Sequence, residues 1–128
     1  MSFNSDKIYD ALNQSPITDL LDTTSGIVGL FDGRTIPEFF TMFKTINFYL
    51  VSPFIGSLEY QEYLYVANCR AKTGAESRTI AQAVFDALNR ADFTDCHTNC
   101  DVLPTIPPAD DTDVYNTPVE ILLKTRNN

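Results

Sequence analysis

The residues best suited to chemistry lie in the stretch D-C-H-T-N-C-D, residues 95–101, where two cysteines flank the only histidine of the chain. Together with Cys69, they would complete a Cys₃His set of zinc ligands, and the spacing of Cys96 and Cys100 is within the range of structural zinc pairs. However, His97 follows Cys96 directly, so the two side chains diverge if the segment is extended. The sequence therefore argues against a metal site.

The same side chains could support nucleophilic catalysis or form a disulfide. Catalysis requires a base that reaches the thiolate and a third group that orients the base, and adjacent Cys96 and His97 are poorly placed for this. A disulfide between Cys96 and Cys100 requires a tight bend, and a reducing cytoplasm opposes it unless the protein later leaves the cell within a particle. The simplest interpretation is a polar turn with reduced thiols. No catalytic residue, cofactor or metal is predicted, and we expect a protein that is not an enzyme.

The composition of the 128 residues predicts a single folded domain, residues 1–128, because 44% of the side chains are apolar and nine are Phe. A formal charge of −8 and scattered Lys and Arg residues oppose the binding of nucleic-acid phosphates. The first residues lack the basic start and apolar run of a signal peptide. The longest apolar tract, residues 46–56, is well short of the roughly 20 residues that span a membrane. We therefore expect a soluble protein that is made in the cytoplasm and contacts no membrane.

Apolar periodicity predicts two helical regions. The first covers residues 5–13 and restarts at Ser15-Pro16, with the proline at the first helical position, as far as about Leu21. The second and clearest runs from Thr73 or Gly74 to about residue 91. Its apolar stripe consists of Ile80, Ala81, Val84, Phe85 and Leu88. Between the two helical regions, the glycines of residues 22–34 predict a loop.

Extended stretches predict about four strands. Residues 46–51 are β-branched and aromatic and should end at Ser52-Pro53, and residues 59–70 alternate in character. A short connection between these two runs predicts an antiparallel hairpin. An extended segment before Pro108 and a final strand over 115–125, with one buried face, complete the set.

The order helix-strand-strand-helix-strand-strand predicts an α+β fold. We expect a two-layer sandwich in which two helices cover one face of a mainly antiparallel sheet of about four strands. Such a small domain has limited interior, so its many aromatic side chains cannot all be buried. The surplus is a mild argument for a surface that contacts another protein.

These elements resemble the tail terminator (tail completion) proteins of long-tailed bacteriophages, the lambda-type minor tail protein family. The resemblance is one of pattern and length over almost the whole chain. The segments that carry it are I-Y-D-A-L-N-Q-S-P-I-T-D-L-L, F-D-G-R-T-I-P, I-N-F-Y-L-V-S, Y-Q-E-Y-L-Y-V-A-N-C-R-A, K-T-G-A-E-S-R-T-I-A-Q-A-V-F-D-A-L-N-R and V-Y-N-T-P-V-E-I-L-L-K-T. The chain departs from the family at P-E-F-F-T-M-F-K and at D-C-H-T-N-C-D.

The resemblance implies a structural virion protein that is assembled in the host cytoplasm. Family members form a hexameric ring that caps the tail tube, ends its polymerisation and joins the tail to the head. The implied partners are further copies of the chain, the major tail tube protein and the head–tail connector or neck protein. DNA would pass through the lumen without specific binding, which suits the acidic charge.

A ring requires head-to-tail contacts between two different surfaces of each subunit. The candidate contact residues are Phe39, Phe40, Phe43, Pro53, Phe54 and Ile55. Two alternatives remain open at this point. One is another ring-forming head–tail adaptor or neck protein, or a small adaptor domain outside phage. The other is a small hydrolase that uses Cys96, His97 and Cys100.

Overall fold

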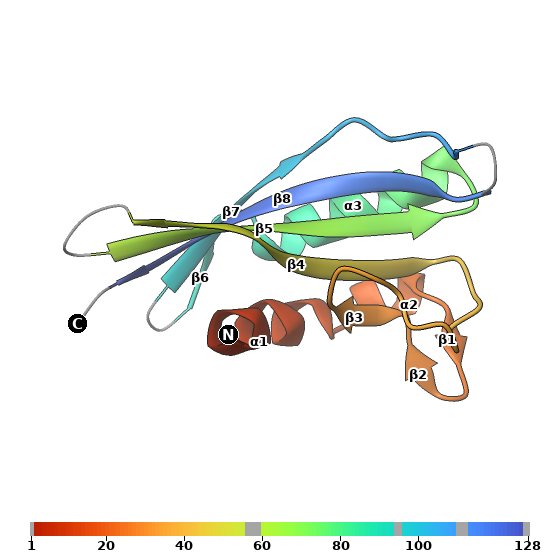
Figure 1. Cartoon of the computed structure of the whole chain (residues 1–128), viewed down its shortest axis with the longest axis horizontal. Helices are drawn as coiled ribbons and strands as arrows, with labels where there is room; N and C mark the ends of the chain where they lie inside the picture. The colour runs from red at the N-terminus through yellow and green to blue at the C-terminus, as the bar shows by residue number, and fades with distance from the viewer. Residues whose placement is uncertain (1, 56–59, 94–95, 110–112, 127–128) are drawn as a thin grey trace.

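The computed structural model describes residues 2–55, 60–93, 96–109 and 113–126, and within these residues three helices accompany a six-stranded sheet and a small hairpin (Figure 1). The helices are α1 (Ser2–Leu12), α2 (Ile17–Leu20) and α3 (Gly74–Leu88). The strands are β1 (Thr23–Thr24), β2 (Ile27–Val28), β3 (Leu30–Asp32), β4 (Thr45–Ile55), β5 (Tyr60–Ala71), β6 (Ala91–Asp92), β7 (Cys96–Val102) and β8 (Tyr115–Arg126).

Helix α3 is the element that the sequence predicted most clearly, and the structure confirms it. Its first turn is capped by Thr73: the Thr73 hydroxyl accepts from the Glu76 amide at 3.1 Å and donates to the Glu76 carboxylate at 3.2 Å. The buried face consists of Ser77, Ile80, Ala81, Val84 and Leu88. The helix ends at Leu88, three residues earlier than expected. None of the helices within the described residues has the length and apolar character to cross a membrane.

The main sheet has the strand order β3-β4-β5-β8-β7-β6 and curls into a half-barrel. β3 and β4 run parallel, whereas every other neighbouring pair is antiparallel. The α+β class is therefore confirmed. The prediction of about four strands and two helices was wrong, because the described residues contain a mixed six-stranded sheet and three helices. The two strands at its edges, β3 and β6, have only three and two residues and are too short to produce a visible period.

One face of the sheet packs on the helices and forms the core. The long strands alternate as predicted, and their buried side chains are Tyr65, Ala67, Cys69 and Ala71 on β5 and Thr117, Val119, Ile121 and Leu123 on β8. The other face, which we call the open face, carries a row of amides. Arg70 donates to Asn47 at 3.3 Å, and Asn116 donates to Asn68 at 3.0 Å. A shift of one residue in register would move these polar groups into the core, so both faces specify the same strand pairing.

The segment predicted as a loop, residues 22–34, contains three short strands. β1 and β2 form a hairpin around Ser25 and Gly26, which both have positive φ, at 53° and 80°. Two such residues in succession are the signature of a type I′ turn, and glycine adopts this conformation without strain. The sequence reading treated Ser25-Gly26 as a general loop signal and missed this hairpin.

The prediction that β4 ends at Ser52-Pro53 was wrong. The strand continues to Ile55 with an irregularity in register between Leu50 and Ser52. β3 pairs only as far as Phe48, so beyond this point no strand among the described residues covers the outer edge of β4. Proline lacks an amide donor and is tolerated in an edge strand, which explains why Pro53 does not stop the strand.

At the opposite edge of the sheet, the Asn89 side chain accepts from the Cys100 amide at 3.0 Å.

The stretch D-C-H-T-N-C-D, predicted as a turn, was also wrongly assigned. Its residues from Cys96 onward form β7, whereas Asp95 lies outside the described residues. Cys96, Thr98 and Cys100 point towards α3 and are buried. Thr98 donates to the Leu88 carbonyl at the end of α3. The stretch therefore alternates as a strand should, but its inward side chains are small and partly polar and do not resemble a strand core.

Candidate interaction surfaces

The cysteines and the histidine do not converge on a reaction centre. Cys96 and Cys100 face the core, while His97 lies on the open face opposite Lys124 of β8. Burial raises the pKa of the Cys69 thiol, and burial followed by the charge of Asp101 raises that of Cys100 to about 12. Thiols of this kind are poor nucleophiles and poor metal ligands at neutral pH. The hydrolase and zinc interpretations therefore do not fit this geometry.

The proposed disulfide between Cys96 and Cys100 is also excluded by the strand. Both residues lie on β7 four positions apart, so their Cα atoms are about 13 Å from each other. A disulfide needs Cα atoms within about 7 Å. All three cysteines, Cys69 included, lie within the described residues and are buried thiols outside any disulfide.

A shallow hollow of about 220 Å³ lies between α2, α3 and the start of β4. It is lined by Asp19, Leu20, Lys44, Ala75, Glu76, Thr79 and Ile80. Its charged groups take part in local contacts. Asp19 accepts from Ser15 at 2.6 Å, Glu76 caps α3, and Lys44 pairs with Asp22. The described residues that line it include no histidine, cysteine or serine, and its carboxylates and ammonium are engaged in these local contacts rather than directed at one another as a nucleophile and its base.

The aromatic segment that precedes β4 is the first of two exposed apolar areas. Phe40 is buried and packs edge-on against Phe31, with the ring centroids 5.3 Å apart. Gly29 makes this packing possible, because a Cβ there would lie 3.0 Å from the Phe40 ring. Phe39 and Phe43, by contrast, are exposed. Of the three predicted contact residues in this segment, the structure thus places Phe40 in the interior and the other two at the surface.

We define the Phe43 surface as the exposed side chains Ile27, Phe39, Met42 and Phe43 together with Lys72. The Lys72 ammonium lies 4.5 Å from the centre of the Phe43 ring, a cation–π contact. A positive charge and an apolar ring are thus presented side by side. The three other predicted contact residues, Pro53, Phe54 and Ile55, extend β4 opposite Tyr63, Glu62 and Gln61. Their side chains lie outside the described residues.

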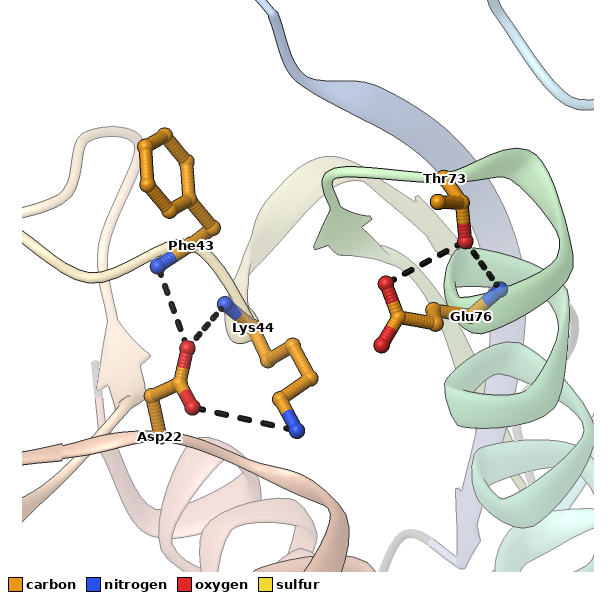
Figure 2. Close-up of polar contacts among 5 residues, drawn as sticks. All are labelled: Asp22, Phe43, Lys44, Thr73 and Glu76. Carbon is orange, nitrogen blue, oxygen red and sulfur yellow. Dashed lines mark hydrogen bonds and ion pairs between the residues drawn. The ribbon is translucent and has the colours of Figure 1, made fainter.

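Asp22 fixes the backbone of the segment that carries Phe43 (Figure 2). Its carboxylate accepts from the backbone amides of Phe43 and Lys44 at 3.2 and 2.9 Å, and it pairs with the Lys44 ammonium at 3.8 Å. The Asp22 amide in turn donates to the Lys44 carbonyl at 2.9 Å. One side chain therefore fixes the backbone from which the Phe43 ring projects.

Replacing Asp22 with alanine should lower the free energy of unfolding by about 1.5–3 kcal/mol, the usual range for hydrogen bonds to a charged group. Asp22→Asn should cost less, because an amide oxygen can still accept from one of the two backbone amides. Urea unfolding measures both effects, and hydrogen exchange should show faster exchange at Phe43 and Lys44. An Asp22→Ala protein as stable as the parent, with unchanged exchange at these amides, would contradict this role.

The second exposed apolar area lies at the opposite edge of the sheet, where the chain leaves β7. We define the Ile106 surface as Asp101, Val102, Ile106 and Asp113, all of which are exposed. It extends round the edge of the sheet, because Asp101 lies on the open face opposite Glu120 and Val102 on the other face opposite Val119. Ile106 exchanges two backbone hydrogen bonds with Asn116, at 2.7 and 3.0 Å. These bonds fix the position of a side chain that is 51% exposed.

A row of hydroxyl groups ties the same segment to the core. Thr117 is fully buried and lies 2.8 Å from the hydroxyl of Ser77 on α3 and 2.9 Å from that of Thr105. Thr105 directly precedes Ile106, so this row supports the Ile106 surface from beneath. The sequence reading named neither Val102 nor Ile106. The sequence signal for this exposed residue was the stretch P-T-I-P-P, in which one isoleucine stands between prolines. Such a stretch is extended but too short to be recognised as a strand.

The net charge of the chain is concentrated in one segment of the sequence, which includes the residues of the Ile106 surface. Residues 91–123 contain seven acidic residues and no lysine or arginine. The whole chain has 17 acidic and nine basic residues, so the other 95 residues hold ten acidic and nine basic side chains. This one segment therefore carries nearly the entire net charge of −8. Its described residues include β6, β7 and most of β8, which are the three strands on the side of the sheet away from β3 and β4.

Comparison with known proteins finds similarity in structure and none in sequence. No family model matches the sequence, and no curated protein matches it with significant similarity. Among solved structures, the chain is similar to a chain in the virion of the native gene transfer agent (GTA) particle. The TM-score is 0.58 at 14% sequence identity, and the match covers 94% of this chain and 92% of the other. At this identity the similarity establishes a shared fold.

Proposed function

We propose that this protein is a structural component of a phage-like virion and that it acts as a tail terminator. The observation that carries the proposal is the fold, which is shared over 94% of the chain with a virion protein of a gene transfer agent. The sequence resemblance to tail terminators points independently to the same kind of particle. The buried cysteines and the position of His97 support a role in assembly, because they leave the Cys/His hydrolase without a workable geometry.

In this role, copies of the chain form a ring, with six subunits expected, at the end of the tail tube. The ring stops addition of the major tail tube protein and offers its other side to the head–tail connector. DNA passes through the lumen, and the net charge of −8 disfavours adhesion of the phosphates. A ring needs two different contact surfaces on each subunit. The Phe43 and Ile106 surfaces, at opposite edges of the sheet, meet this requirement.

The proposal is tested by the native mass of the purified protein and by its effect on tube assembly. We expect a ring several times the 14.3 kDa mass of the chain, and tail tubes that stop growing and carry a ring at one end when it is added. Electron microscopy measures tube length with and without the protein. The matched negative control is Phe48→Ala, which disrupts the core and should leave tubes uncapped. A protein that stays monomeric at all concentrations and never changes tube length would refute the proposal.

A head–tail adaptor is the second candidate, and the shared fold with a virion chain supports it equally. An adaptor would also form a ring, but it would bind the head connector in the absence of tubes and leave tube growth unaffected. Binding assays with isolated connectors and isolated tubes therefore distinguish the two functions.

A further inference from the structure

We infer that copies of this chain associate head to tail, with the Phe43 surface of one copy against the Ile106 surface of the next. The inference rests on the proposed function, since it specifies how the subunits of the ring join. In this inference, the partner that binds each of the two exposed apolar surfaces is a second copy of this chain.

The first argument is position. The strand order places β3 and β4 at one edge of the sheet and β7 and β6 at the other. The loop that carries Phe43 leads into β4, whereas the segment that carries Ile106 runs along β8 after β7. In Figure 1 the orange-to-yellow loop before β4 and the light-blue segment after β7 accordingly lie on opposite sides of the sheet. Both adjoin the same end of β5, because Thr45 pairs with Arg70 and Tyr115 pairs with Ala71. A contact between two different edges is head to tail, and such contacts form a closed ring when the rotation from one copy to the next closes.

The second argument is composition. Each surface exposes large apolar side chains, with Phe39 at 52% and Ile106 at 51% exposure, and such side chains mark contact sites where they gather in a patch. Each also rests on a rigid support, which for Phe43 is the Asp22 carboxylate and for Ile106 is the Ser77–Thr117–Thr105 row. Surfaces that are held in place lose little conformational freedom on binding, which favours association.

The third argument is charge, and it decides between the possible pairings. Lys72 places a positive charge over the Phe43 ring. The Ile106 surface carries Asp101 and Asp113 within the segment that lacks any lysine or arginine. Pairing two Ile106 surfaces would bring like charges together, and pairing two Phe43 surfaces would oppose two Lys72 side chains. Only the unlike pairing matches a cation with acidic groups, and electrostatic matching of this kind fixes which surfaces meet.

The test is an exchange of charges between the two surfaces. Lys72→Glu and Asp101→Lys should each reduce the native mass towards the 14.3 kDa of a single chain, and the double variant should restore the parent mass. Both positions are exposed, and Asp101 lies opposite Glu120 in the sheet, so its replacement by lysine removes a like-charge pair and preserves folding. Arg78→Glu makes the same charge change as Lys72→Glu on an exposed position of α3 and should leave the ring intact.

Two variants that place aspartate at exposed apolar positions test the apolar part of the interface. Ile106→Asp should give monomers, whereas Val51→Asp, at a site that is 48% exposed on β4, should not. Circular dichroism checks that each variant is folded.

The inference is overturned if the parent forms a ring that Lys72→Glu and Asp101→Lys leave unchanged. It is also overturned if the folded double variant stays monomeric. In both cases the proposed function stands. If rings persist but no longer cap tubes, the two surfaces contact the tube protein instead, and the inference is again overturned. A parent protein that forms no ring overturns both.

Discussion

Replacing Phe48 with alanine should lower the free energy of unfolding by about 3–5 kcal/mol, the range for removing a buried phenylalanine. Phe48 is completely buried in the first half of β4, and its ring centroid lies 6.4 Å from that of Tyr9 on α1. Its neighbour across the sheet is Ala67 on β5. Because the alanine side chain is small, the Phe48 ring fills the space above both residues. The truncated side chain would leave a cavity between α1 and the sheet, which the surrounding backbone can close only in part.

Urea unfolding followed by circular dichroism measures this loss. Because a ring would make the apparent stability depend on subunit concentration, the comparison belongs at concentrations where the protein is monomeric. Phe39→Ala is the matched control, since it removes the same side chain from an exposed position and should cost about 1 kcal/mol or less. A Phe48→Ala protein that unfolds at the same urea concentration as the Phe39→Ala protein would show that α1 does not pack on β4 as described.

The thiols should be almost inert in the folded protein. A thiol-specific reagent at pH 8 should label none of Cys69, Cys96 and Cys100 on the time scale of a free thiol, and should label all three in denaturant. The reason is that all three are buried and that burial raises the pKa of Cys69 and of Cys100, so little thiolate is exposed to the reagent. If labelling requires global unfolding, the rate should fall by a factor of a thousand or more for a stable domain.

Mass spectrometry counts the labelled thiols, and Cys96→Ala and Cys100→Ala assign them. After mild oxidation the folded chain should keep its mass, because the two cysteines of β7 lie too far apart to form a bond. Rapid labelling of one cysteine in the native state, or the loss of two hydrogens on oxidation, would contradict the placement of β7. The single variants should retain the fold, since alanine is small enough for these positions.

The parts of the fold that sequence reasoning recovered are those with long, regular patterns. Helix α3 shows an apolar stripe over 15 residues, and β5 and β8 alternate over 12 residues each. β7 alternates just as regularly, but Cys96, Thr98 and Cys100 are not the branched and aromatic residues that usually mark a strand core. Asn99 and Asp101 also favour turns in short sequences. The tertiary environment, which supplies β8 on one side and α3 above, decides the conformation of this stretch.

Sequence reasoning pointed to exposed aromatic residues on one side of the sheet only, and whether they contact another protein stays a prediction. Phe39 and Phe43 stand out because aromatic residues in a short loop have few places to be buried. Phe40 has the same sequence context as Phe39 and Phe43. Its burial depends on Gly29, which is eleven residues away in the sequence but next to the Phe40 ring in space. Ile106 could not be recognised without the strand order. Its exposure depends on the pairing with Asn116 at the edge of β8.

The outer edges of the sheet have a consequence for the behaviour of the protein at high concentration. An uncovered strand edge can template another strand, and unlimited growth of this kind produces amyloid-like fibres. Beyond Phe48, β4 carries Pro53, which has no amide to donate, and on β7 the Cys100 amide is already bonded to Asn89. Each edge thus withholds a donor that an incoming strand would need. Strand addition is therefore disfavoured at Pro53 on one edge and at Cys100 on the other.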